Sequence, residues 1–171
     1  QTHPILPVLE GLGFEAVDSW HCLQFDLHIT QIPFSRKQMS LRRTHNLNQI
    51  SDPDFKDILL NAVYSHLATS QLQLTNRQSG EAESTITFAC LAQSYPNWPI
   101  GGVDVIRYSS STDSDTTHYE FLLCEILRQL PQSGLSPLRL HVDANDAQSL
   151  ETAKAIGFER IITSSHVEYM I

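Results

Sequence analysis

The stretch NDAQSLETAKAIGF, residues 145–158, decides the fold of this chain. Its first residue, Asn145, is predicted to cap a helix, with Gln148 three residues later as the partner in a capping box. The stretch closes on Gly157, and glycine suits the left-handed backbone position that ends many helices. Between these two ends, apolar residues recur at helical spacing. The sequence therefore predicts one helix here, directly before the last strands of the chain.

The end of this stretch has a second copy near the start of the chain. LGFE at residues 12–15 recurs as IGFE at residues 156–159, and the apolar pattern continues on both sides, with Phe25 matching Tyr169. A repeat of this kind indicates two related structural units. We interpret residues 1–27 as the C-terminal helix and hairpin of a preceding unit, and residues 28–171 as one full unit. The apolar face of the tail is expected to pair with the sheet or with a second copy of the chain.

Strands alternate with amphipathic helices through the full unit. Apolar residues follow helical spacing at 55–66, after Asp52 as cap and Pro53 in the first turn, and again at 119–130. The expected strands are short and separated by turn residues, and they cover residues 38–41, 84–93, 100–108 and 138–142. Residues 71–83 are expected to form a loop or a weak strand. A terminal hairpin is expected from residues 160–163 and 166–171. This alternation predicts an α/β layer architecture.

Composition narrows the class of protein. Eleven Lys and Arg against nineteen Asp and Glu leave a net charge of −8, which argues against nucleic acid as a partner and is compatible with a cationic substrate such as an amine. No apolar run is long enough for a membrane span, and the chain starts without a signal-peptide pattern. The three cysteines, Cys22, Cys90 and Cys124, lack metal or redox spacing and are expected to be reduced, buried thiols. We therefore expect a cytoplasmic protein with no membrane partner.

The stretch at 145–158, together with the VEYMI ending at 167–171, resembles the penultimate helix and last strand of the GNAT superfamily of N-acetyltransferases. The order of elements over residues 38–171 is similar to that of the family as well, and IGG at 100–102 is similar to a strand of its central hairpin. The resemblance implies an α/β fold with a GNAT-like mixed central sheet flanked by helices. It also implies that residues 1–27 end a preceding GNAT-like unit, so that the partner is an upstream half or, in a homodimer, a second copy.

The same resemblance implies an acyl-CoA-dependent N-acyltransferase that acts on a small-molecule or peptide amine, with acetyl-CoA as the cofactor. In the family, a glycine-rich loop before a central helix brings backbone N–H groups close to the pyrophosphate. That loop falls on SDTTHY at residues 114–119. The residues that the resemblance places against the cofactor are Ser114, Thr116, Thr117 and Asn145.

Several residues depart from the family pattern. The loop holds no glycine, and Thr117 with Glu120 forms a capping-box pattern that would satisfy the first amides of the helix. Ala153 stands where many members carry a tyrosine that protonates the leaving thiolate. The catalytic residues are therefore unassigned, and enzymatic activity is left open. The alternative is a non-catalytic GNAT-like domain that serves packing, ligand sensing or dimerisation.

Two other pairs of residues are candidates for acid–base chemistry. Tyr108 and Tyr119 lie near the expected cleft, although Tyr119 belongs to an apolar helical stripe and is expected to pack in the core. His141 and Asp143, two residues apart at a strand end, suit an acid–base pair or two metal ligands. A third ligand at recognisable spacing is missing from the sequence, so no metal is expected.

Overall fold

The computed structural model of the chain describes residues 6–26, 31–53, 67–91, 102–111, 116–133 and 137–169. These residues form both helices and strands, although the strands at Ala68–Asn76 and Ala82–Cys90 follow each other without a helix between them. In chain order they are α1 (Leu6–Gly11), β1 (Phe14–Phe25), α2 (Arg36–Thr44), β2 (His45–Ser51), β3 (Ala68–Asn76), β4 (Ala82–Cys90), β5 (Val103–Ser110), α5 (Thr116–Ser133), β6 (Leu138–Asp143), α6 (Ala147–Ile156) and β7 (Glu159–Tyr169).

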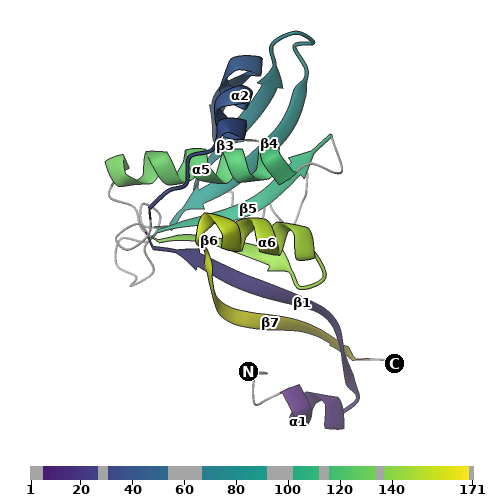
Figure 1. Ribbon diagram of the computed structural model, residues 1–171. Helices are drawn as coiled ribbons and strands as arrows, with labels where there is room; N and C mark the ends of the chain where they lie inside the picture. Colours follow the sequence, from purple (N-terminus) through teal and green to yellow (C-terminus); the bar gives the residue numbers. More distant parts are fainter. Residues whose placement is uncertain are drawn as a thin grey trace.

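The strands build one mixed sheet in the order β2-β3-β4-β5-β6-β1-β7. All neighbouring pairs are antiparallel except β5 and β6, which run parallel. Figure 1 shows α5 crossing one face of this sheet, with α6 beside it and α2 near the end of the sheet that β3 and β4 form. The expected α/β architecture with a mixed sheet flanked by helices is confirmed.

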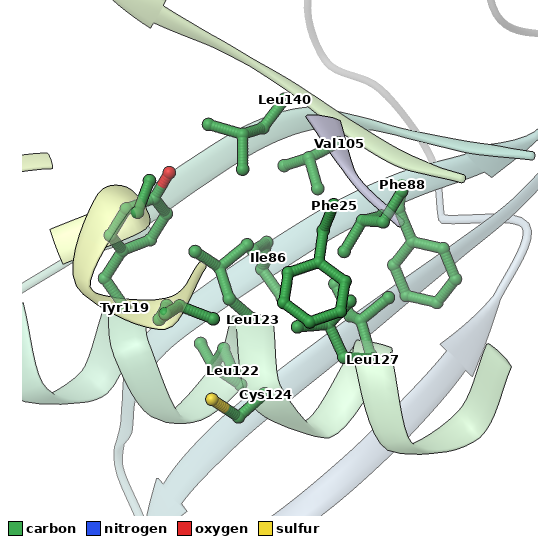
Figure 2. Close-up of a cluster of buried hydrophobic side chains, with 14 of the residues drawn as sticks. Phe25, Ile86, Phe88, Val105, Tyr119, Leu122, Leu123, Cys124, Leu127 and Leu140 are labelled. Carbon is green, nitrogen blue, oxygen red and sulfur yellow. The ribbon is translucent and has the colours of Figure 1, made fainter. Parts of the chain in front are cut away.

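The apolar stripe of α5 forms the centre of the core. All six stripe residues are buried, and they pack on inward-facing residues of β3, β4, β5, β6 and β1; the stripe consists of Tyr119, Leu122, Leu123, Ile126, Leu127 and Leu130. Figure 2 shows side chains of this cluster, with Phe25 from β1 packed among residues from the strands of the full unit. The Phe25 ring also lies 5.4 Å from that of Phe158, between centroids. The N-terminal strand is therefore part of the same core.

The thiols are free and are buried or partly buried in the structure, as the sequence predicts. Burial raises the pKa of Cys22 and that of Cys90 above the ordinary value. Burial also raises the pKa of Cys124 to about 11, although Gln38 donates a hydrogen bond to its sulfur at 3.4 Å. Thiols with raised pKa are poor nucleophiles at neutral pH, so a structural role fits all three.

The prediction of a strand at residues 38–41 is wrong, because these residues lie inside the helix α2. Ser35 caps this helix by accepting a hydrogen bond from the backbone N–H of Gln38 at 3.2 Å. Gln38 and Leu41, one helical turn apart, are the buried residues of α2. Gln38 donates to Glu120 of α5 at 3.1 Å, so the helix is held by a tertiary contact that a four-residue pattern does not reveal. The strand follows immediately, as β2.

The terminal hairpin predicted at 160–163 and 166–171 is also wrong in the described part of the chain. Residues 159–169 form the single strand β7, and no turn interrupts them. The strand that pairs with β7 is β1, which also pairs with β6 on its other edge. Figure 1 shows β1 and β7 as a long two-stranded ribbon that extends beyond the helices, with α1 at its far end. The N-terminal segment therefore fills the place expected of a hairpin partner.

The repeated sequence motif has the same local structure in both copies. In each, a glycine with positive φ lies between a helix and the strand that follows: Gly13 has φ of 89° between α1 and β1, and Gly157 has φ of 114° between α6 and β7. The predicted left-handed closure at Gly157 is confirmed, and its N–H bonds to the carbonyl of Ala153 at 3.2 Å. The division into residues 1–27 and 28–171 stays a prediction, although the two local structures agree with it.

The other predictions divide between confirmed elements and segments outside the described residues. The strands expected at 84–93, 100–108 and 138–142 correspond to β4, β5 and β6. The stretch 71–83, left open between loop and weak strand, contains most of β3, a turn and the start of β4. The helix expected at 55–66 lies wholly outside the described residues. Within the described part of the chain, no helix is both long and apolar enough to cross a membrane.

Candidate functional site

The parallel strands β5 and β6 separate after a short ladder. Their register pairs only three residues on each strand, and it ends where Val105 lies opposite Leu140. Directly after this point β5 carries a bulge, because Phe88 of β4 pairs with Val105 and Thr87 pairs with Arg107, so that Ile106 is the extra residue. A bulge bends its strand and increases the local twist. The bulge therefore explains why β5 turns away from β6 and leaves an opening between them.

Close contacts hold β5 and β6 together at the end where the two strands are paired. The N–H of Val103 donates to the carbonyl of Pro137 at 2.9 Å, just before the two strands pair. A Cβ at Gly102 would lie 2.2 Å from that same carbonyl oxygen, and Gly102 has φ of 96°, so this position requires glycine. One step further along, Arg139 Nε donates to Asp104 Oδ1 at 2.7 Å between the paired residues of β5 and β6. These contacts fix the point from which the strands diverge.

The opening is a cleft of about 320 Å³. Its walls come from β5, β6, the first turns of α5 and α6, and β1. The lining residues are Trp20, Val105, Ile106, Arg107, Tyr108, Tyr119, Leu140, His141, Val142, Asp143, Asp146 and Ser149. Because Trp20 belongs to β1, the cleft is built partly from the N-terminal segment. Sequence reasoning assigned that segment to a different unit and missed Trp20 as a site residue.

Two tyrosines form one wall of the cleft. The rings of Tyr108 and Tyr119 lie 4.8 Å apart between centroids, at an interplanar angle of 48°. Tyr119 is both a buried core residue, as expected, and a lining residue of the cleft, and Figure 2 shows its hydroxyl oxygen pointing away from α5. Burial raises the pKa of Tyr119 well above its ordinary value, and the charge of Asp146 and the neighbouring Tyr108 raise it further. Tyr119 is therefore a neutral phenol at physiological pH, a proton donor but not a base.

Two carboxylates lie where β6 leads into α6, and both accept hydrogen bonds from backbone N–H groups. Asp143 accepts from the N–H of Asn145 at 2.8 Å, and Asp146 caps α6 by accepting from the N–H of Ser149 at 3.0 Å. The cleft thus carries two negative charges and one positive charge, that of Arg107, when His141 is neutral. A cleft with this balance attracts a cationic group more than an anionic one.

The residues proposed for cofactor binding have different outcomes. Thr116 and Thr117 occupy the first turn of α5, beside the cleft residue Tyr119, while Ser114 lies outside the described residues. Asn145 is exposed and is not a lining residue of the cleft, and the prediction that it caps the helix is wrong, because Asp146 does so. Asp146 is the N-cap because it directly precedes Ala147, the first residue of α6.

The predicted capping box of Thr117 with Glu120 is wrong as well. Since α5 begins at Thr116, Thr117 lies within the helix, and Glu120 accepts a hydrogen bond from Gln38 of α2 at 3.1 Å instead. Ala153, at the position where the resemblance would expect a tyrosine, is fully buried. The pair His141 and Asp143 does line the cleft, as its place at a strand end suggested. Ser149, in the first turn of α6, also lines the cleft, and no sequence pattern points to it.

No protein-family model matches the chain, and no curated protein matches it. Solved structures do match. A GCN5-related N-acetyltransferase from Sphaerobacter thermophilus superposes with a TM-score of 0.66 at 13% identity, covering 95% of this chain and 55% of that protein. A tandem GNAT protein from the clavulanic acid biosynthesis pathway gives 0.62 at 9% identity, over 96% of this chain and 60% of that protein.

A third match, a GCN5-related N-acetyltransferase from Kribbella flavida, gives a TM-score of 0.56 at 13% identity, over 96% of this chain and 63% of that protein. The chain therefore has the GNAT fold, as its resemblance implied. It spans only about 55–63% of the length of these three proteins. At such low identity the likeness concerns the fold, and the activity has to be argued from the cleft.

Proposed function

We propose that this chain is an acyl-CoA-dependent N-acyltransferase whose acyl donor binds between β5 and β6. The observation that carries the proposal is the divergence of these two parallel strands after Val105 and Leu140, with the bulge at Ile106 at the same place. Beyond this point the edge of β5 that faces β6 offers backbone N–H and C=O groups to a ligand instead of a strand. An elongated chain with amide groups, such as the acyl-pantetheine arm of acetyl-CoA, suits an opening of this kind.

The residues fit the arm of acetyl-CoA better than its phosphates. The lining of the cleft combines apolar residues and two tyrosines with polar side chains, and its carboxylates, Asp143 and Asp146, would repel phosphate groups. The N-terminus of α5 at Thr116 is the part of the site that favours an anion, because its first N–H groups have no partner within the helix. Bound acetyl-CoA would supply an activated acyl group as a thioester. In this arrangement Tyr119 holds a proton at the cleft wall, and the two carboxylates attract an amine acceptor.

Calorimetric titration of the full chain with acetyl-CoA tests the proposal. We expect micromolar binding by the wild-type chain and binding at least tenfold weaker for Ile106→Trp, because the indole would fill the cleft. Ile162→Trp is the matched control, since Ile162 is an exposed strand residue of β7 that does not line the cleft. Equal affinity in both variants would contradict the assigned position of the ligand.

Two observations favour a second function. The acidic residues of the cleft and the glycine-free approach to α5 suit a non-catalytic GNAT-like domain that packs against an upstream half or a second copy, or that senses a ligand. If the folded wild-type chain fails to bind acetyl-CoA even at millimolar concentration, the acyltransferase proposal is overturned and this alternative is supported.

A further inference from the structure

A cluster of three metal-ligating side chains lies away from the cleft. It consists of His45 at the start of β2, Glu83 in β4 and His118 in the first turn of α5, and none of them lines the cleft. The ligand atoms of the three side chains all lie within 4.8 Å of one another. His45 and His118 are 8% and 7% exposed, and Glu83 is 23% exposed at its side chain. Two buried imidazoles and one partly exposed carboxylate therefore converge on one point.

The same carboxylate oxygen faces both imidazoles. Glu83 Oε2 lies 2.8 Å from His45 Nε2 and 3.8 Å from His118 Nε2. Ligand atoms bound at about 2.0–2.1 Å to one tetrahedral zinc ion are about 3.3 Å apart. The distances of 2.8 Å and 3.8 Å from Glu83 Oε2 to the two imidazoles lie on either side of this value. The third separation within the group is at most 4.8 Å. The three ligand atoms are thus nearly in place for one ion.

Each of the three side chains is also oriented by a second contact. The other ring nitrogen, Nδ1, lies 2.8 Å from the hydroxyl of Thr44 in His45 and 2.8 Å from the hydroxyl of Ser84 in His118. Asn76 donates to the other carboxylate oxygen, Glu83 Oε1, at 2.8 Å. Without an ion, Nε2–H of His45 donates to Glu83 Oε2 at 2.8 Å. Zinc would replace the proton on Nε2, and the Thr44 and Ser84 hydroxyls can accept from Nδ1–H in the tautomer that binds a metal through Nε2. Partners of this kind usually orient the ligands of a metal site.

We propose that His45, Glu83 and His118 bind a Zn²⁺ ion, with a water molecule completing its coordination at the partly exposed side of Glu83. Two imidazoles and one carboxylate are an established ligand set for zinc, with a fourth position left open. Magnesium, by contrast, prefers oxygen ligands and keeps several waters, so it does not suit two buried imidazoles. The ion joins β2, β4 and α5, three elements that are distant in sequence, and it thereby stabilises the folded state through binding.

The test is zinc titration of the full chain after treatment with a chelator. We expect one Zn²⁺ bound per chain, a higher midpoint of thermal unfolding with zinc, and no such rise with Mg²⁺. His118→Gln and His45→Gln should each weaken zinc binding at least 100-fold. His21→Gln is the matched control, because His21 lies on β1 outside both the cluster and the cleft, with its ring 3.0 Å from the hydroxyl of Thr163, and its substitution should leave the affinity unchanged.

A further variant guards against loss of folding. Glu83→Gln keeps the shape of the side chain and an oxygen that can accept from Asn76, but it removes the charge, so we expect a folded chain by circular dichroism with zinc binding weakened by at least tenfold. Two results overturn the proposal. One is a folded wild-type chain that shows neither zinc binding nor a higher midpoint of thermal unfolding at zinc concentrations up to roughly 100 times that of the protein. The other is zinc binding that all three cluster variants retain, which would place the ion elsewhere on the chain.

Discussion

The first turn of α5 has an open cleft on one side and a closed polar cluster on the other. Tyr119 lines the cleft between β5 and β6, while His118, the preceding residue, contacts Ser84 and Glu83 of β4. On the cleft side the strands have separated, so backbone groups and side chains face a free volume. On the cluster side β4 and α5 are in contact, and the side chains of His118, Ser84 and Glu83 contact one another. The same helix turn thus borders two different sites. The cleft lies where β5 and β6 diverge, and the polar cluster lies on the side of β4, which stays paired with β5.

The largest effect on the free energy of unfolding is expected from a substitution at Gly102, where the paired part of β5 and β6 begins. Gly102→Ala should lower the free energy of unfolding by about 3 kcal/mol, because the added Cβ would lie 2.2 Å from the carbonyl oxygen of Pro137 and the backbone has positive φ. Gly80→Ala is the control, since Gly80 also has positive φ, 73°, but no atom of the described residues lies within 4 Å of an added Cβ. It should cost about 1 kcal/mol. Urea denaturation measures both, and equal costs would show that the close approach to Pro137 does not hold the strands.

The next effect concerns the cluster side. Ser84 is only 2% exposed, and its hydroxyl lies 2.8 Å from His118 Nδ1 and 3.0 Å from Ser110 Oγ. Ser84→Ala should destabilise the chain by about 1–2 kcal/mol, because it removes the hydroxyl partner of a buried imidazole. Ser109→Ala, at an exposed position of β5, should change stability by less than about 0.5 kcal/mol. Chemical denaturation distinguishes the two, and a similar loss in both variants would mean that the cluster is not a stabilising network.

A smaller effect is expected at the paired part of β5 and β6. Asp104→Asn should lower the free energy of unfolding by about 1 kcal/mol, because it weakens the charged hydrogen bond from Arg139, whose Nε lies 2.7 Å from Asp104 Oδ1. The bond is partly exposed, so salt should reduce the difference between wild type and variant. Denaturation at low and high ionic strength measures this dependence. A difference that does not change with salt would argue that the pair acts through packing instead of charge.

The smallest effect concerns the ionisation of Tyr119. Its pKa in the folded chain is raised by burial, so folding is favoured fully below the unfolded pKa of about 10 and this contribution is lost as the pH rises above it. Tyr119→Phe cannot ionise in either state. The wild-type chain should therefore lose more stability than this variant between pH 8 and pH 10.5. Equal losses would show that Tyr119 is more accessible to water than its position in the cleft wall indicates.

Sequence patterns predicted the parts of the fold that depend on local periodicity. The stripe from Tyr119 to Leu130, the strand β6 and the closure at Gly157 follow from spacing and from the backbone preference of glycine. The helix α2 was missed because its buried side chain, Gln38, is polar and is held by Glu120, far away in sequence. The hairpin prediction failed because nothing in residues 159–169 reveals that β1 occupies the neighbouring position in the sheet.

The candidate sites were harder to predict than the fold. The pair His141 and Asp143 was noticed because both lie at one strand end, and both line the cleft. The bulge at Ile106 left no mark in the sequence, since it is defined by pairing with β4. The cluster of His45, Glu83 and His118 was missed for a similar reason, because its members come from three elements and have no fixed spacing. Only the folded sheet brings such residues together.

Hydrogen exchange of the full chain, followed by mass spectrometry with and without acetyl-CoA, tests the central claim most directly. If the donor binds where β5 and β6 diverge, peptides covering residues 103–110 and 138–146 should exchange more slowly when acetyl-CoA is present. Peptides from β3, residues 68–76, lie away from the cleft and should be unaffected. Protection that is absent, or that occurs in β3 but not in β5 and β6, would contradict the assignment of the cleft as the acyl-CoA site.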